Sequence, residues 1–164
     1  MESGIESVID PEHAASFEAL FGFIYQGDPE AIRVSLELVR MLHVWDDLVD
    51  GDETSSSAIN AAFSSALFEI SSSWLWDEQA IAIARVQYFK WQAANYFEQL
   101  KEKPPRRICA IAYVYRAGFF DLFYYFAYKL YGMAWAEKIA PEIAEWYGES
   151  FSDYEHEMWG VKNG

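Results

Sequence analysis

The chain has 164 residues, 52% hydrophobic and 18% aromatic, which suffices for a hydrophobic core and excludes a disordered polymer. Twelve basic against 26 acidic residues give a formal net charge of −14, which disfavours direct binding to nucleic acid or to a membrane surface. With one cysteine there is no internal disulfide, and the acidic N-terminal stretch lacks the order of a signal peptide, so we expect a cytoplasmic protein.

The hydrophobic pattern is helical along the whole chain and predicts a single all-α domain over residues 1–164. Proline, aspartate and glycine signals delimit the expected helices, which cover residues 11–26, 29–50, 56–74, 78–102, 106–131 and 133–158. Pro141 either kinks the last helix or divides it. The sequence therefore predicts a bundle of six or seven helices.

The most hydrophobic stretch, residues 108–132, is long enough to span a bilayer. Arg116 and Asp121 interrupt it, and tyrosines recur along it. We therefore expect the helix over 106–131 to be the buried central helix of the bundle, with no membrane span.

The second predicted helix ends in a cluster of acids, "HVWDDLVDGD". On a helical wheel His43, Asp46 and Asp50 continue an apolar face, Asp47 lies beside it, and the polar arc with Arg33, Glu37 and Arg40 is elsewhere. Carboxylates one turn apart can share a hard cation such as Mg²⁺. The alternative is that the helix frays after Trp45 and the aspartates lie in water.

The last predicted helix has acids at i, i+4 and i+8, namely Glu149, Asp153 and Glu157. Glu149 and Asp153 are the expected contributors to a metal site from across the bundle. An acidic stripe beside an apolar one is also typical of a solvated helix surface.

Two charges of the central helix need partners, because a buried charge is costly unless it is paired. Arg116 either forms a structural ion pair with an aspartate of the second helix or acts as a phosphate-binding cation. In the second case, Arg116 and His43 are the expected substrate-binding residues.

The stretch "DDLVD", residues 46–50, resembles the Asp-Asp-x-x-Asp motif of class I isoprenoid synthases. The resemblance implies magnesium ions on Asp46, Asp47 and Asp50 that grip a substrate diphosphate. The spacing of Glu149, Asp153 and Glu157 is similar to the second metal motif of that family, with different residue types. The resemblance covers about a dozen residues, and those enzymes are usually much longer.

"HVWDDLVDGD" and "RAGFFDLFYYFAYKLYGMAW" look like small proteins of tailed bacteriophages, a resemblance that implies no established activity. Asp47 and Asp50 also resemble half of the acidic pattern of all-α nucleotide pyrophosphatases, without a second acidic pair shortly downstream. The paired Glu-x-x-His motifs of di-iron bundles are missing.

Two functions follow as hypotheses. The first is a magnesium-dependent protein that binds or acts on a diphosphate or nucleotide phosphate, with the ion offsetting phosphate charge. The second is a non-enzymatic, phage-type interaction or virion-associated protein that binds a basic partner, with its aromatic residues forming a self-association face.

Overall fold

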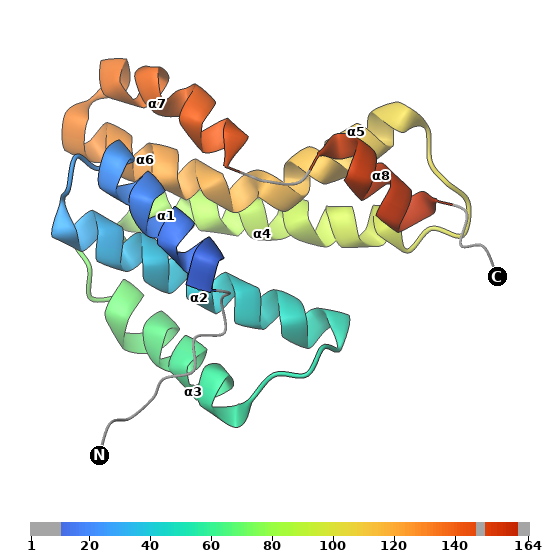
Figure 1. Cartoon of the computed structure of the whole chain (residues 1–164), viewed down its shortest axis with the longest axis horizontal. Coiled ribbons are helices and arrows are strands. Elements are labelled where there is room, and N and C mark those ends of the chain that lie inside the picture. The colour runs from blue at the N-terminus through green and yellow to red at the C-terminus, as the bar shows by residue number, and fades with distance from the viewer. Residues whose placement is uncertain (1–10, 147–149, 161–164) are drawn as a thin grey trace. The chain divides into compact units, whose positions relative to one another are not determined.

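The computed structural model describes residues 11–146 and 150–160 and confirms the all-α fold, since these residues contain no strand. The chain divides into two compact units, unit 1 (Met1–Asp77) and unit 2 (Glu78–Gly164), and each is described by itself. The elements, labelled in Figure 1, are α1 Pro11–Ile24, α2 Pro29–Asp50, α3 Ser56–Ser64, the π-helical η1 Ser65–Ile70, α4 Glu78–Glu98, α5 Arg106–Arg116, the 3-10 turn η2 Ala117–Phe119, α6 Phe120–Tyr131, α7 Met133–Glu145 and α8 Phe151–Trp159.

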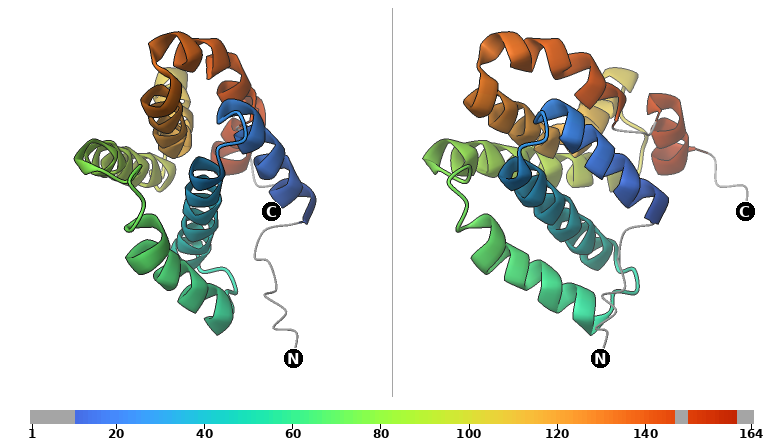
Figure 2. Two further views of the ribbon diagram at one scale, coloured as in Figure 1. Left: turned by 90° about the vertical axis from the view of Figure 1, so that its left-hand side faces the viewer. Right: turned by 60° about the vertical axis from the view of Figure 1, so that its left-hand side comes forward.

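Helix α2 is the central element of unit 1 and lies between α1 and α3, as Figures 1 and 2 show. Asp28 caps its start by accepting a hydrogen bond from the Ala31 N–H at 2.9 Å, and Pro29 occupies the first turn, where a missing N–H costs nothing. The helix ends at Gly51, whose φ of +82° is the left-handed conformation that glycine adopts easily. Both ends are those predicted from the sequence.

An aromatic column holds α1 on α2. Phe17, Phe21 and Tyr25 stack at i, i+4 and i+8, with ring centroids 5.7 and 5.8 Å apart. The Tyr25 hydroxyl is fully buried and shares a 2.8 Å hydrogen bond with Ser35. Burial raises the pKa of Tyr25, so the ring stays neutral and its polar atom is satisfied inside the core.

The third helix differs from the single helix predicted over residues 56–74, because its second half widens into the π-helical η1. Ser65 and Ile70 are both buried although they are five residues apart, and π-turns bring residues at that spacing onto one side. The Ser65 hydroxyl donates a hydrogen bond to Glu37 of α2, and Arg33 donates to Glu69 at 3.1 Å. The polar arc of α2 therefore faces η1 in part.

Unit 2 is built on α4, which runs beside α5, η2 and α6, while α7 packs on α6 and α8 on α5. The helix predicted over residues 106–131 is interrupted by η2, where buried Gly118 lies against the side chain of Gln87. The tighter 3-10 turn brings the backbone of η2 close to α4. Among the described helices, none combines the length and hydrophobicity needed to cross a bilayer.

The last predicted helix, residues 133–158, is two helices. Pro141 lies inside α7, so the division does not fall at the proline. The separate start of α8 has a local cause: Ser150 caps it by accepting a hydrogen bond from the Asp153 N–H at 3.1 Å.

Gly118→Ala tests the close approach of η2 to α4. A Cβ at this position would lie 2.2 Å from Oε1 of Gln87, so Gln87 must move and release its bond to Asp121. We expect urea denaturation to show a loss of about 1 to 3 kcal/mol. Gly22→Ala on α1, with nothing within 4 Å of its added Cβ, is the control and should gain up to about 1 kcal/mol. In a Gln87→Ala background the added Cβ meets no Gln87 side chain, so the loss of stability should become smaller. An equal loss of stability in that background would contradict the explanation.

Candidate functional site

The acidic tip of α2 is helical through Asp50, so the helix does not fray after Trp45. The carbonyl oxygen of Asp47 accepts hydrogen bonds from the N–H groups of Gly51 and Asp52, which closes the helix end. Asp46 and Asp47 are half-buried and Asp50 is exposed. Burial therefore decreases along the predicted face toward the tip.

The magnesium site stays a prediction. Asp46, Asp47 and Asp50 lie together on the last turns of α2, as the sequence indicated. Among residues 11–146 and 150–160, no three His, Cys, Asp or Glu side chains gather in a way that suits a metal ion. Asp52 and Glu53 immediately precede the start of α3, where the helix dipole favours negative charge.

The acids predicted from the last helix have different positions. Glu149 lies outside the described residues. Asp153 is exposed on α8 and accepts a 2.6 Å hydrogen bond from the Ser150 hydroxyl, which in turn accepts from the Asp153 N–H. Asp153 thus completes a capping arrangement, a structural role that the sequence reasoning missed although a serine three residues before an acid is its usual signal.

His43, predicted to bind substrate, packs inside unit 1. Its ring meets Phe17 of α1 edge to face, with the centroids 6.4 Å apart. The contact joins α1 to the half of α2 that carries the aspartates. Substrate binding by His43 stays a prediction.

Arg116 forms the structural ion pair that the sequence predicted, but with Glu98 of α4 and not with an aspartate of α2. Its Nε and Nη2 donate to the two carboxylate oxygens at 2.9 and 2.6 Å, and the two side chains are only 15% and 8% exposed. The guanidinium lies over the ring of Trp91, 5.1 Å from its centroid. This geometry gives the buried charge a structural explanation; a role in phosphate binding stays a prediction.

The pair also anchors α8. Tyr154, 2% exposed, donates a 2.5 Å hydrogen bond to Oε1 of Glu98. Glu155, the next residue, binds Lys103 at 2.9 Å, and the hydrogen bond from Lys103 is the main cause that lowers the pKa of Glu155. Arg106 also approaches Glu155, at 3.5 Å, so α8 is held by a buried hydrogen bond and by peripheral ion pairs.

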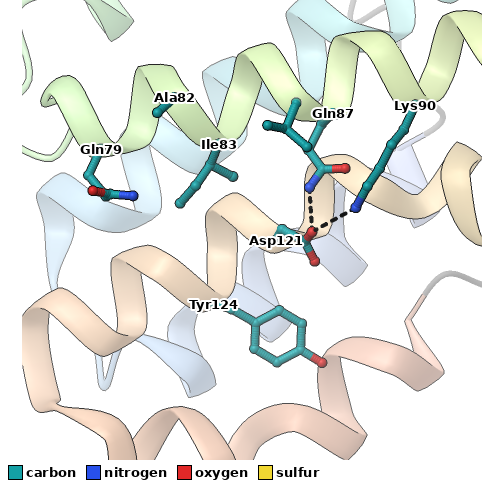
Figure 3. Close-up of a pocket in the computed structure, with 8 residues that line it drawn as sticks. Gln79, Ala82, Ile83, Gln87, Lys90, Asp121 and Tyr124 are labelled. Atoms are coloured by element: carbon teal, nitrogen blue, oxygen red, sulfur yellow. Dashed lines mark hydrogen bonds and ion pairs between the residues drawn. The ribbon is translucent and has the colours of Figure 1, made fainter.

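Asp121 is not buried, contrary to the sequence-based expectation, since its side chain is 49% exposed. It lies at the edge of an open groove of about 570 Å³ between α4 and α6 (Figure 3), where Gln87 donates a hydrogen bond to it and Lys90 approaches to 4.0 Å. Tyr124 and the apolar side of α4 form the rest of the wall. The opposite charges of Lys90 and Asp121 offset each other, so the groove offers a mostly apolar surface.

The sequence reasoning missed an exposed apolar face on α3 and η1, which we call the α3–η1 face. It consists of Ile59, Phe63, Leu67 and Phe68, and the two phenylalanines are 66% and 63% exposed. The signal was present in the spacing of 59, 63 and 67, which repeats every four residues about 100° around the helix from Ala58 and Ala62.

The charge is divided unequally between the units. Unit 1 contains 15 acidic residues against two arginines, a formal net charge of −13, whereas unit 2 contains 11 acidic against ten basic residues, a net charge of −1. Both arginines of unit 1 pair with glutamates of the same unit. Unit 1 is therefore strongly acidic on its own.

Comparisons with known proteins give no relative from which a role can be transferred: no protein-family model, curated protein or solved structure matches the chain.

Glu98→Gln tests the buried ion pair. The variant removes the charge of the Glu98 carboxylate from a pair that is largely shielded from water, and we expect a loss of about 2 to 3 kcal/mol in chemical denaturation. The control is Glu30→Gln, which removes one of the two carboxylate partners of Arg33 in a pair more exposed than that of Glu98, and it should cost less than about 1 kcal/mol. Similar losses for the two variants would show that Glu98 and Arg116 form no special pair.

A magnesium titration tests the predicted metal site. An ion that binds only the folded state raises the melting temperature with its concentration, and Asp46→Ala should abolish that rise. Glu18→Ala, which removes an exposed acid of α1, should retain it. Scanning fluorimetry at constant ionic strength is the measurement. Equal melting temperatures of the wild type with and without millimolar magnesium would rule the site out.

Proposed function

We propose that the protein is a non-enzymatic interaction protein whose unit 1 binds a basic protein partner through the α3–η1 face. The observation that carries this proposal is that small side chains are buried and large aromatic side chains are exposed in this part of unit 1. Helix α3 packs Ala58 and Ala62 against Val44 of α2 and leaves Phe63 exposed, and η1 leaves Phe68 exposed.

Large aromatic side chains contribute most when they are buried, whereas alanine contributes little. A helix that only had to pack on α2 would place its largest side chains inward. Four large apolar residues on one exposed helix face form the kind of patch that marks an interaction site. Asn60 and Ser64, the neighbouring exposed positions, are uncharged.

The charge of unit 1 indicates the kind of partner. Asp52 and Glu53 are exposed immediately before α3, and Glu69, 53% exposed, lies near the end of η1. An apolar face bordered by acids at both ends is complementary to an amphipathic helix with an apolar stripe and lysines or arginines beside it. A nucleic acid or an anionic membrane would be repelled by the same field.

The magnesium-dependent function inferred from Asp46, Asp47 and Asp50 stays a second prediction. What favours it is the half-buried position of Asp46 and Asp47 on the last turns of α2. The magnesium titration decides it independently of the interaction.

A synthetic amphipathic helix with leucines on one face and lysines on the other is a direct probe. Fluorescence anisotropy should show binding to the wild type and at least tenfold weaker binding to Phe63→Ser/Phe68→Ser, because two buried aromatic anchors contribute more than about 1.4 kcal/mol. The matched control is Phe89→Ser/Tyr96→Ser on α4, which removes side chains of equal exposure, 63% and 66%, and should bind as the wild type does.

The charge requirement is tested with the same helix carrying glutamates in place of lysines, which should not bind. Raising the salt concentration should weaken binding of the lysine helix. Binding of both peptides alike, or unchanged binding to Phe63→Ser/Phe68→Ser, would overturn the proposal.

A further inference from the structure

Unit 2 has an exposed apolar face of its own, on the outer side of α4. Ile81, Tyr88, Phe89 and Tyr96 are between 40% and 66% exposed. At 100° per residue they fall within an arc of about 100°, which also contains Arg85 and, at the start of the helix, the exposed Glu78. We call this the α4 face.

The opposite side of α4 already supplies the core of unit 2. Ala80, Gln87, Trp91 and Ala94 are buried there. The α4 face is thus a second apolar side of the same helix, as the α3–η1 face is a second apolar side of α3. Both units thus contain a helix that exposes large apolar side chains in addition to those it buries.

The surroundings of the α4 face are basic. Residues 78–107, which include the face and the connection to α5, contain six lysines and arginines against three glutamates. Lys103 and Arg106 pair with Glu155, and Lys90 approaches Asp121. One of these glutamates, Glu98, is 8% exposed and paired with Arg116, so it adds little negative charge to the surface. Lys101 and Arg107 are exposed. This segment has the sign opposite to that of unit 1.

We propose that the α3–η1 face of one copy of the protein binds the α4 face of a second copy. This inference rests on the proposed function, since it identifies one basic partner of unit 1 as the chain itself. The α4 face offers what the α3–η1 face requires, namely aromatic side chains bordered by lysines and arginines. Pairing two α3–η1 faces would instead bring together two units with a net charge of −13 each.

The proposed contact is heterologous, because it joins different faces of identical chains. Such a contact leaves one α3–η1 face and one α4 face open in every dimer, so copies add until a ring closes or a chain grows. The association should strengthen with protein concentration and weaken with salt.

The test uses the full chain and two double variants. In sedimentation equilibrium, the wild type at low salt should rise in mean mass above the 18.9 kDa of one chain as its concentration increases from micromolar to millimolar. Phe63→Ser/Phe68→Ser alone and Phe89→Ser/Tyr96→Ser alone should each remain monomeric. An equimolar mixture of the two variants should form a heterodimer and grow no further, because each variant keeps the face that the other has lost.

Far-UV circular dichroism establishes that both variants are folded. Self-association of Phe89→Ser/Tyr96→Ser equal to that of the wild type would overturn the proposal, because it would show a contact that does not use α4. A mixture of folded variants that stays monomeric, or a monomeric wild type at all concentrations, would also overturn it. In each case the lysine peptide reports separately on the proposed function, which stands if the peptide binds the wild type and falls if it does not.

Discussion

Small side chains at the helix contacts constrain both units. Ala58 and Ala62 face α2 in unit 1, and Ala94 and Ala112 lie together between α4 and α5 in unit 2. Alanine lets helix backbones approach closely, but it buries little apolar area. On α3, η1 and α4, large aromatic side chains also lie on the exposed side, and these form the two exposed apolar faces.

Polar residues join the helices where alanine contributes little. Glu98 binds Arg116 and accepts a hydrogen bond from Tyr154, so one carboxylate connects α4, α5 and α8. In unit 1 the hydrogen bond between Ser65 and Glu37 does the same for η1 and α2. These contacts are directional and therefore set how the helices align, whereas apolar packing alone tolerates sliding.

The kind of partner that unit 1 can bind depends on its charge and its exposed apolar surface together. An acidic surface alone indicates solubility as readily as binding, and so does an isolated exposed phenylalanine. In unit 1 a net charge of −13 coincides with four exposed apolar side chains on one helix face, while the aromatic face of α4 lies in the basic segment of the chain. Opposite charges beside two apolar faces favour a specific contact that weakens with salt.

The all-α fold, the ends of α2 at Asp28 and Gly51, and the need of Arg116 for a partner follow from the amino-acid sequence, because caps, glycine turns and the cost of a buried charge are local properties. Contacts between helices establish that Glu98 pairs with Arg116, that η1 widens, and that a 3-10 turn forms at Gly118. Each of these features depends on contact with a residue that is distant in the chain. The hydrophobic periodicity of a helix does not encode such contacts. The same holds for the outward phenylalanines: helical spacing shows that two sides of a helix are apolar, but only packing selects which side is buried.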